Sequence, residues 1–206
     1  MPDDRDPTAC AGCRLQSWLC VCAISPRLMI RTKLIAISHV RDMGRTSNTV
    51  RLLSLAIRDV TVICHGASPT PTDPTASVPV DATPIVLFPG HGARTLTPEL
   101  VASLPSPPAL IIPDGNWHQA SRMVKRIPLL AQAVKVALPD RVFAGMAVRR
   151  NQQGHHMSTY EAVAQALGIL EGEIVSEPLF EFYRRATDRL LLVSGKIRLG
   201  DVYGGI

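Results

Sequence analysis

Short apolar runs alternate along most of the chain with segments whose apolar residues recur at helical spacing. The apolar runs predict β-strands at 33–39, 60–64, 85–88, 109–112 and 134–138. Start signals and spacing predict helices at 48–57, from Thr97, at 117–127, at 158–170 and after Pro178. Because fully apolar strands alternate with helices, the sequence predicts an α/β fold: a mostly parallel sheet with helices on both faces.

Unusual loops follow three of the predicted strands. They begin at Phe88-Pro-Gly-His, at Pro113-Asp-Gly-Asn-Trp, and in the stretch from Arg149 to Glu161. Ligands of parallel sheets bind beyond the carboxyl ends of the strands, where a substrate would reach the Asp114 carboxylate. Alternatively, Asp114 or Asn116 only caps the following helix. Trp117 is either a core residue or a stacking surface.

Four of the five cysteines lie within thirteen residues, with the spacing C-x2-C-x6-C-x-C: Cys10, Cys13, Cys20 and Cys22. A segment this short has almost no core of its own, and four thiolates satisfy one tetrahedral zinc ion. Two disulfides, free thiols or an iron–sulfur cluster are the alternatives. We therefore expect a zinc-binding segment at 1–26 and an α/β domain at 27–206. Cys64 ends an apolar run and is expected to be a buried strand residue.

Composition narrows the class of protein. With 46% hydrophobic and 19% charged residues, the 206-residue chain is not a disordered one. No signal peptide or run of about 18 apolar residues is visible, so we expect a cytoplasmic protein without a membrane segment. The sequence contains no phosphate-binding P-loop and no complete dinucleotide fingerprint, which disfavours nucleoside triphosphates and nicotinamide as ligands. It also contains no nucleophile elbow.

The net charge of +5 is unevenly distributed along the chain. Residues 27–58 and 118–150 each hold seven basic residues and one acid, so the remainder of the chain is acidic. Such concentration is typical of phosphate-binding surfaces, although two solvated faces that never meet would give the same pattern. Aromatic residues make up 4% of the chain, which disfavours a broad base-stacking platform.

Five motifs, in order, resemble those of the DTW-domain proteins. They are Cys10-x2-Cys13-x6-Cys20-x-Cys22, His39 with Arg45-Thr-Ser-Asn-Thr49, Leu87-Phe-Pro-Gly90, Asp114-Gly-Asn-Trp-His-Gln-Ala120, and Arg149 followed by Ser158-Thr-Tyr-Glu-Ala162. The resemblance covers about residues 10–170. This chain has Asn116 where the family usually has Thr, which leaves the role of a Thr hydroxyl open.

The resemblance implies a SPOUT-like domain with a C-terminal trefoil knot and an activity on tRNA. The 3-amino-3-carboxypropyl group of S-adenosylmethionine would pass to N3 of a uridine, and methylthioadenosine would leave. Two other hypotheses are a SPOUT-type RNA methyltransferase, which would release S-adenosylhomocysteine, and a zinc-containing RNA-binding protein without catalysis.

The resemblance also implies roles for individual residues. Asp114 would accept the imide proton or orient the uracil. The cofactor would be enclosed by three loops that supply Leu87, Phe88, Pro89, Gly90, Asp114, Gly115, Trp117, Ser158, Thr159 and Glu161. RNA phosphates would be contacted by Arg45, Arg122, Arg149 and Arg150. The zinc held by the four cysteines would be structural, and no magnesium or redox cofactor is implied.

Overall fold

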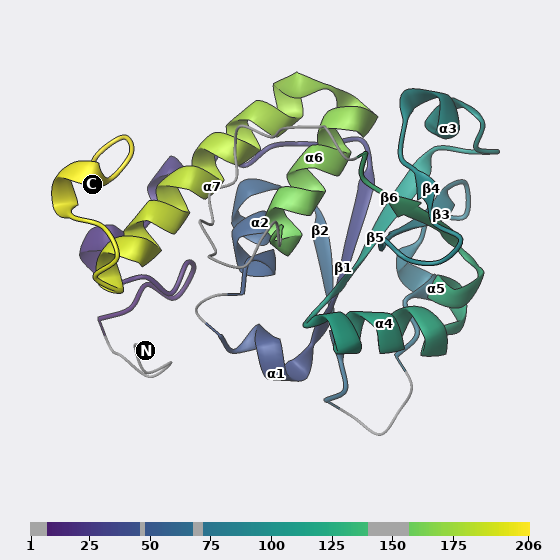
Figure 1. The fold of residues 1–206 in the computed structure, drawn as a ribbon, viewed down its shortest axis with the longest axis horizontal. Coiled ribbons are helices and arrows are strands. Elements are labelled where there is room, and N and C mark those ends of the chain that lie inside the picture. The colour runs from purple at the N-terminus through teal and green to yellow at the C-terminus, as the bar shows by residue number, and fades with distance from the viewer. Residues whose placement is uncertain (1–7, 46–47, 68–71, 140–156) are drawn as a thin grey trace.

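A six-stranded sheet forms the centre of the computed structural model, which describes residues 8–45, 48–67, 72–139 and 157–206 (Figure 1). The strands are β1 (Lys33–His39), β2 (Val60–His65), β3 (Thr83–Leu87), β4 (Arg94–Thr95), β5 (Pro108–Asp114) and β6 (Val134–Ala137). Their order in the sheet is β2-β1-β5-β3-β6-β4, and each of these pairings is parallel. The predicted parallel α/β sheet is confirmed.

Helices cover both faces of this sheet (Figure 1). The α-helices are α1 (Val40–Met43), α2 (Val50–Ala56), α3 (Pro98–Ala102), α4 (Trp117–Arg126), α5 (Pro128–Gln132), α6 (Thr159–Glu171) and α7 (Glu173–Val193). Single 3-10 turns lie at Ser17–Leu19, Cys22–Ile24, Thr75–Ser77 and Leu199–Asp201. Alternate residues of β1 and β5 point to opposite faces of the sheet. On one face, Leu34 and Leu110 pack in a cluster with α2, α3, α6 and α7. On the other face, Ile35 and Ile111 pack in a second cluster with α4 and α5.

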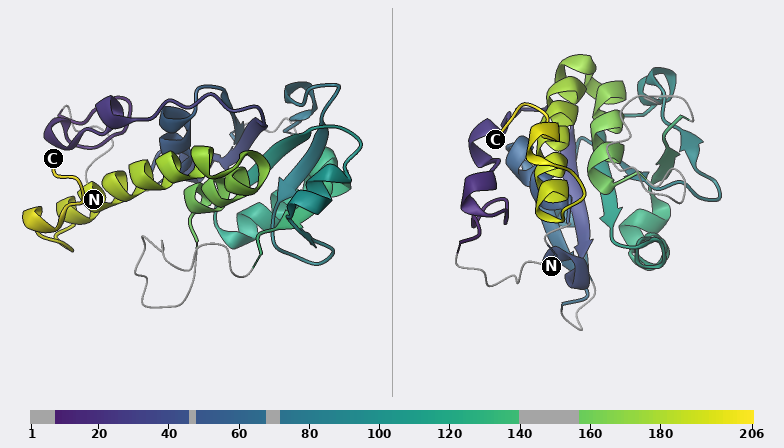
Figure 2. Two further views of the ribbon diagram at one scale, coloured as in Figure 1. Left: turned by 90° about the horizontal axis from the view of Figure 1, so that it is seen from above. Right: turned by 60° about the vertical axis from the view of Figure 1, so that its left-hand side comes forward.

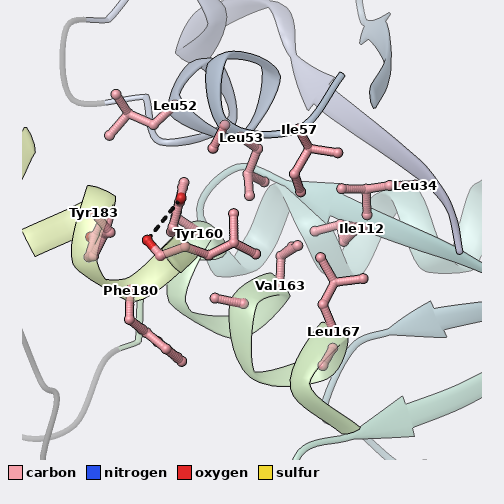
Figure 3. Packing of buried hydrophobic residues seen from close by; sticks show 14 of the residues in the cluster. Leu34, Leu52, Leu53, Ile57, Ile112, Tyr160, Val163, Leu167, Phe180 and Tyr183 are labelled. Atoms are coloured by element: carbon pink, nitrogen blue, oxygen red, sulfur yellow. Dashed lines mark hydrogen bonds between the residues drawn. The ribbon is translucent and has the colours of Figure 1, made fainter. Parts of the chain in front are cut away.

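Helix α6 lies at the centre of the larger apolar cluster (Figure 3). The Tyr160 ring stacks on Tyr183 with 4.7 Å between centroids, and its hydroxyl donates a hydrogen bond of 3.0 Å to the Leu179 carbonyl. Burial raises the pKa of Tyr160 well above its ordinary value. The neutral phenol therefore ties α6 to α7 inside the core.

Helix α7 begins earlier than the sequence predicted. We expected a helix after Pro178, but α7 starts at Glu173 and contains this proline. Gly172, at φ +95°, separates α7 from α6, and Val175 and Ser176 are already buried ahead of the proline. Tertiary packing of this first turn outweighs the local cost of proline.

The cysteine segment packs on the C-terminal half of α7 (Figures 1 and 2). Its buried side chains Leu15, Leu19 and Val21 belong to the same apolar cluster as α2 and α7. The buried guanidinium of Arg189 donates to the carbonyls of Leu19 at 3.4 Å and Cys20 at 2.7 Å. The segment therefore shares the core of the α/β body.

Three smaller features differ from the sequence prediction or lie beyond it. Cys64 is exposed rather than buried, because β2 is an edge strand and alternate residues of its carboxyl half face outward. Three elements were not predicted: α1, β4 and α5, each five residues or fewer.

The trefoil knot depends on the chain path between β6 and α6, and residues 140–156 of that path lie outside the described residues. Within the described part of the chain, no helix is both long and apolar enough to cross a membrane.

Candidate functional site

The strand order creates a switch point between β1 and β5. From β1 the chain runs through α2 to β2 on one side, whereas from β5 it runs through α4 and α5 to β6 on the other. Neighbouring parallel strands whose connections diverge in this way leave a crevice at their carboxyl ends. Ser38 and Asp114 are register partners at those two ends.

Asp114 lies at this crevice with only 6% of its surface exposed. Its Oδ2 accepts hydrogen bonds from Ser38 Oγ at 2.9 Å and Asn48 Nδ2 at 3.2 Å, and its Oδ1 accepts one from Thr159 Oγ1 at 2.7 Å. An ionised carboxylate offers about four acceptor positions, so described residues occupy three of them. Asp114 therefore joins β1, the amino end of α2, β5 and the amino end of α6.

Sequence reasoning missed two of these partners. Ser38 is the polar residue in the buried stretch of β1, whose other buried residues are apolar, and that departure from the pattern was the available signal. Asn48 belongs to the family motif Arg45–Thr49, but the sequence predicted no role for its side chain. Thr159 was predicted to bind the cofactor, and in the structure its hydroxyl contacts Asp114.

Asn116, rather than Asp114, caps helix α4. Asn116 Oδ1 accepts the Gln119 backbone N–H at 3.0 Å, and Gln119 Oε1 accepts the Asn116 backbone N–H at 2.6 Å. A Cβ at Gly115 would lie 2.8 Å from Gln119 Oε1, so a side chain at this position would crowd the capping box as it stands. The capping alternative is thus correct for Asn116, and Asp114 remains available for other contacts.

The predicted capping box at the start of α6 is confirmed. Ser158 Oγ accepts the Glu161 N–H at 3.2 Å, and Glu161 Oε2 accepts the Ser158 N–H at 2.9 Å. Between these two residues, the backbone N–H of Tyr160 donates to Thr49 Oγ1 at 3.3 Å. These contacts fix the amino end of α6 against α2 and Asp114.

The loop after β3 meets the start of α4 through two aromatic rings. Phe88 is buried and stacks on Trp117 with 4.8 Å between centroids and 21° between planes. Trp117 is 58% exposed, which makes it a stacking surface rather than a core residue. Leu87 is buried at the strand end, and Pro89 and Gly90 are exposed beyond it. Of the third predicted loop, residues 149–156 lie outside the described residues.

The two basic segments meet at a cavity of 590 Å³ beside the switch point. Its lining includes His39 and Arg41 from the first segment and His118 and Arg122 from the second. The alternative of two basic faces that never meet is therefore wrong for these residues.

The other predicted RNA-binding arginines are placed differently. Arg45 is exposed, and its Nη1 lies 2.8 Å from Asp42 Oδ1. Arg149 and Arg150 lie outside the described residues.

The four N-terminal cysteines form one cluster whose Sγ atoms all lie within 4.8 Å of one another. The Sγ separations include 3.4 Å for Cys10–Cys20, 3.6 Å for Cys10–Cys22 and 3.8 Å for Cys13–Cys20. A tetrahedron of sulfurs about 2.3 Å from a central ion has edges of about 3.8 Å, whereas a disulfide is about 2.05 Å long. The cluster fits a single metal ion, and all four thiols are free of disulfides.

Two further observations suit a metal at this cluster. Hydrogen bonds, chiefly from the Cys13 backbone, lower the pKa of Cys10 to about 6, whereas burial raises the pKa values of Cys13 and Cys22. A cation would keep those buried sulfurs deprotonated. A Cβ at Gly12 would lie 2.8 Å from Cys22 Sγ, so the turn around the cluster leaves no room for a side chain.

Comparison with known proteins gives matches over most of the chain. The model of the DTW domain family matches residues 7–191. A tRNA-uridine aminocarboxypropyltransferase 2 from Mus musculus is 28% identical over 200 residues, covering 94% of this chain and 67% of the relative. The protein of the same name from Macaca fascicularis is 29% identical over 175 residues, with 82% and 58% covered. A tRNA-uridine aminocarboxypropyltransferase A from Arabidopsis thaliana is 26% identical over 213 residues, with 87% and 81% covered. No solved structure matches.

Proposed function

Because the chain belongs to the DTW domain family, we propose that it transfers the 3-amino-3-carboxypropyl group of S-adenosylmethionine to N3 of a uridine in tRNA. The observation that carries the proposal is the family match over 7–191, which includes the Asp114 junction and the loops around it. The relatives named for this activity supply the substrate class.

The chemistry is a substitution at the γ-carbon of the amino acid side chain. N3 of the uridine forms the new N–C bond, the C–S bond breaks, and its electron pair neutralises the sulfonium to give methylthioadenosine. The proton on N3 leaves as the bond forms. Because the leaving group is already good, the main task of the protein is to hold N3 and the carbon in line.

Asp114 orients the uracil in this proposal. Ser38, Asn48 and Thr159 fix its carboxylate from three sides, and among the described residues they leave about one acceptor position for the N3–H of the base. A carboxylate held in this way is well placed to receive the imide proton late in the attack, when N3 has become more acidic. Positioning the base is its principal contribution.

The cofactor is held by the loops predicted from the sequence. Leu87 to Gly90 follow β3, Gly115 and Trp117 follow β5, and Ser158, Thr159 and Glu161 begin α6. The Phe88–Trp117 ring pair offers an exposed aromatic face, and the amino end of α6 offers a positive dipole for a carboxylate. The proposed arrangement is SPOUT-like, with a C-terminal trefoil knot.

The remaining assignments complete the proposal. Residues 1–26 hold a structural zinc ion through Cys10, Cys13, Cys20 and Cys22, and residues 27–206 form the catalytic domain. Arg45, Arg122, Arg149 and Arg150 contact tRNA phosphates. The zinc, when bound, supplies no step of the reaction.

The deciding experiment is one incubation of the protein with S-adenosylmethionine and unmodified tRNA, followed by mass spectrometry of small molecules and nucleosides. We expect methylthioadenosine together with aminocarboxypropyluridine. S-adenosylhomocysteine with a methylated nucleoside would instead identify an RNA methyltransferase. Absence of any product, with tRNA and S-adenosylmethionine both bound, would contradict the transferase and favour a binding protein.

A further inference from the structure

The cavity between β1, β2 and α4 lies next to the Asp114 junction. Its lining includes His39 and Arg41, which directly follow Ser38 and β1, and Asn116, His118, Gln119 and Arg122 from the start of α4. No acidic side chain lines the cavity among the residues that the structure describes. Its 590 Å³ lies in the range of pockets that hold a nucleotide-sized ligand.

Three polar side chains of this lining have their acceptor atoms already in use. Nδ1 of His39 accepts the Arg41 backbone N–H at 3.2 Å, so the ring proton is on Nε2. The capping box of α4 occupies Oδ1 of Asn116 and Oε1 of Gln119. What remains on each of these side chains is an N–H group that can only donate.

The two arginines add unpaired positive charge. Within the described residues, the guanidinium groups of Arg41 and Arg122 form no hydrogen bond or ion pair, in contrast to Arg45, which pairs with Asp42. Both side chains are exposed and line the cavity. Donor groups together with unpaired guanidinium groups match the requirements of an oxyanion.

We propose that this cavity binds a backbone phosphate of the RNA, from a nucleotide next to the modified uridine. The inference rests on the proposed function, since it places the phosphate beside Asp114. Ser38 bonds to Asp114 and directly precedes His39, so a phosphate held by His39, Arg41 and Arg122 sets the depth to which the neighbouring base enters the crevice. Phosphate contacts fix register in this way without reading sequence.

Asn116 gives the proposal its sharpest test, because its two side-chain atoms have separate tasks. Oδ1 caps α4, and Nδ2 is the donor left for the anion. Asn116→Asp keeps the cap, since Asp and Asn are equally good caps, but replaces the donor by a charged acceptor. Asn116→Thr keeps a cap and replaces the amide donor by a hydroxyl on a shorter side chain, without adding charge.

The experiment measures the Kd of the full chain for an unmodified tRNA transcript as a function of salt, and separately its Kd for S-adenosylmethionine. We expect the double variant Arg41→Gln/Arg122→Gln to raise the tRNA Kd about tenfold at low salt and to reduce the salt slope by about 1. Asn116→Asp should raise the tRNA Kd about tenfold, and Asn116→Thr should raise it about threefold. None of these changes should alter the Kd for S-adenosylmethionine.

Arg126→Gln is the matched control, because Arg126 is exposed on the same helix but does not line the cavity. An equal effect of Arg126→Gln would show general attraction to the helix and would overturn the phosphate site. Loss of S-adenosylmethionine binding with tRNA binding unchanged would assign the cavity to the cofactor carboxylate and overturn it equally. Wild-type protein that binds no tRNA would also overturn the phosphate site.

The phosphate site and the proposed function fail in different ways. If wild-type protein produces methylthioadenosine while the three variants bind tRNA normally, the site is wrong and the transferase stands. If the variants lose tRNA binding but the wild type yields no methylthioadenosine, the phosphate site stands and the transferase is wrong.

Discussion

Asp114 accepts hydrogen bonds from three side chains on separate elements, so a substitution there affects both the fold and the proposed reaction. Asp114→Asn removes the negative charge and replaces one accepting oxygen by an amide NH2 group, so at least one of the bonds from Ser38, Asn48 and Thr159 loses its acceptor oxygen. We expect a loss of about 1–3 kcal/mol in the free energy of unfolding and loss of transfer. Urea unfolding and product analysis measure the two effects.

Asp59→Asn is the matched control for this change, because Asp59 is exposed. It should leave the free energy of unfolding within about 0.5 kcal/mol of wild type. Asp114→Asn protein with full activity would contradict the orienting role of the carboxylate. An unchanged free energy of unfolding in Asp114→Asn protein would contradict the structural role of the three hydrogen bonds to Asp114.

Trp117 is expected to matter for cofactor binding more than for stability. The ring is 58% exposed and stacks on Phe88, so its removal costs little core packing. We expect Trp117→Ala to raise the KM for S-adenosylmethionine about tenfold while changing stability by less than about 1 kcal/mol. Trp117→Phe, which keeps a ring on Phe88, should restore most of the affinity. Wild-type KM in Trp117→Ala would show that the ring pair does not contact the cofactor.

Helices α6 and α7 cross closely at Gly168 and Ser176, which provides a prediction at the scale of elements. A Cβ at Gly168 would lie 3.0 Å from Ser176 Oγ, and this hydroxyl is fully buried with no hydrogen-bond partner among the described residues. Because an unpaired buried hydroxyl is costly, we expect Ser176→Ala to stabilise the protein by about 1 kcal/mol.

Ser54→Ala provides the comparison, since Ser54 is an exposed helical residue whose hydroxyl donates to the Val50 carbonyl. Both substitutions gain the same helix propensity, so the difference between them isolates the buried hydroxyl. A melting temperature for Ser176→Ala at or below that of Ser54→Ala would contradict the prediction.

The elements that sequence predicted well are those with a strong local signal. Uniform apolar runs gave β1 and β5, and the Ser158–Glu161 capping box fixed the start of α6. Helix α7 was misplaced because proline normally begins a helix, whereas here buried contacts of Val175 and Ser176 extend it toward the amino end. Cys64 was misjudged because an apolar run does not reveal whether its strand is at the edge of the sheet.

For the candidate site, sequence reasoning identified the loops but not their bonds. Asp114 was singled out by its place after a buried strand, yet its partner Ser38 is 76 residues away and appears only through strand register. The cavity was invisible for the same reason, since its lining comes from His39, Arg41 and the first turns of α4. Long-range pairing of this kind leaves no periodic signal in the sequence.

At the scale of the whole molecule, the cysteine cluster stabilises more than its own segment. Leu15, Leu19 and Val21 extend the main apolar cluster, and Arg189 of α7 bonds to the carbonyls of Leu19 and Cys20. If the cluster holds a metal ion as we propose, its loss would loosen this packing together with the local turns. We therefore expect the metal to be coupled to the stability of the entire fold.

Wild-type protein should contain about one zinc ion per chain by elemental analysis, and strong chelation should lower its melting temperature in one cooperative transition.

Cys13→Ser should lose the ion and show the same lowered melting temperature without chelator, because the buried Sγ of Cys13 is replaced by a poor zinc ligand. Cys64→Ser, which changes an exposed cysteine outside the cluster, should keep both the ion and the stability. Gly12→Ala should weaken zinc binding by crowding Cys22 Sγ. Metal-free wild-type protein of undiminished stability would contradict this coupling, because the core contacts of the segment would then form without the ion.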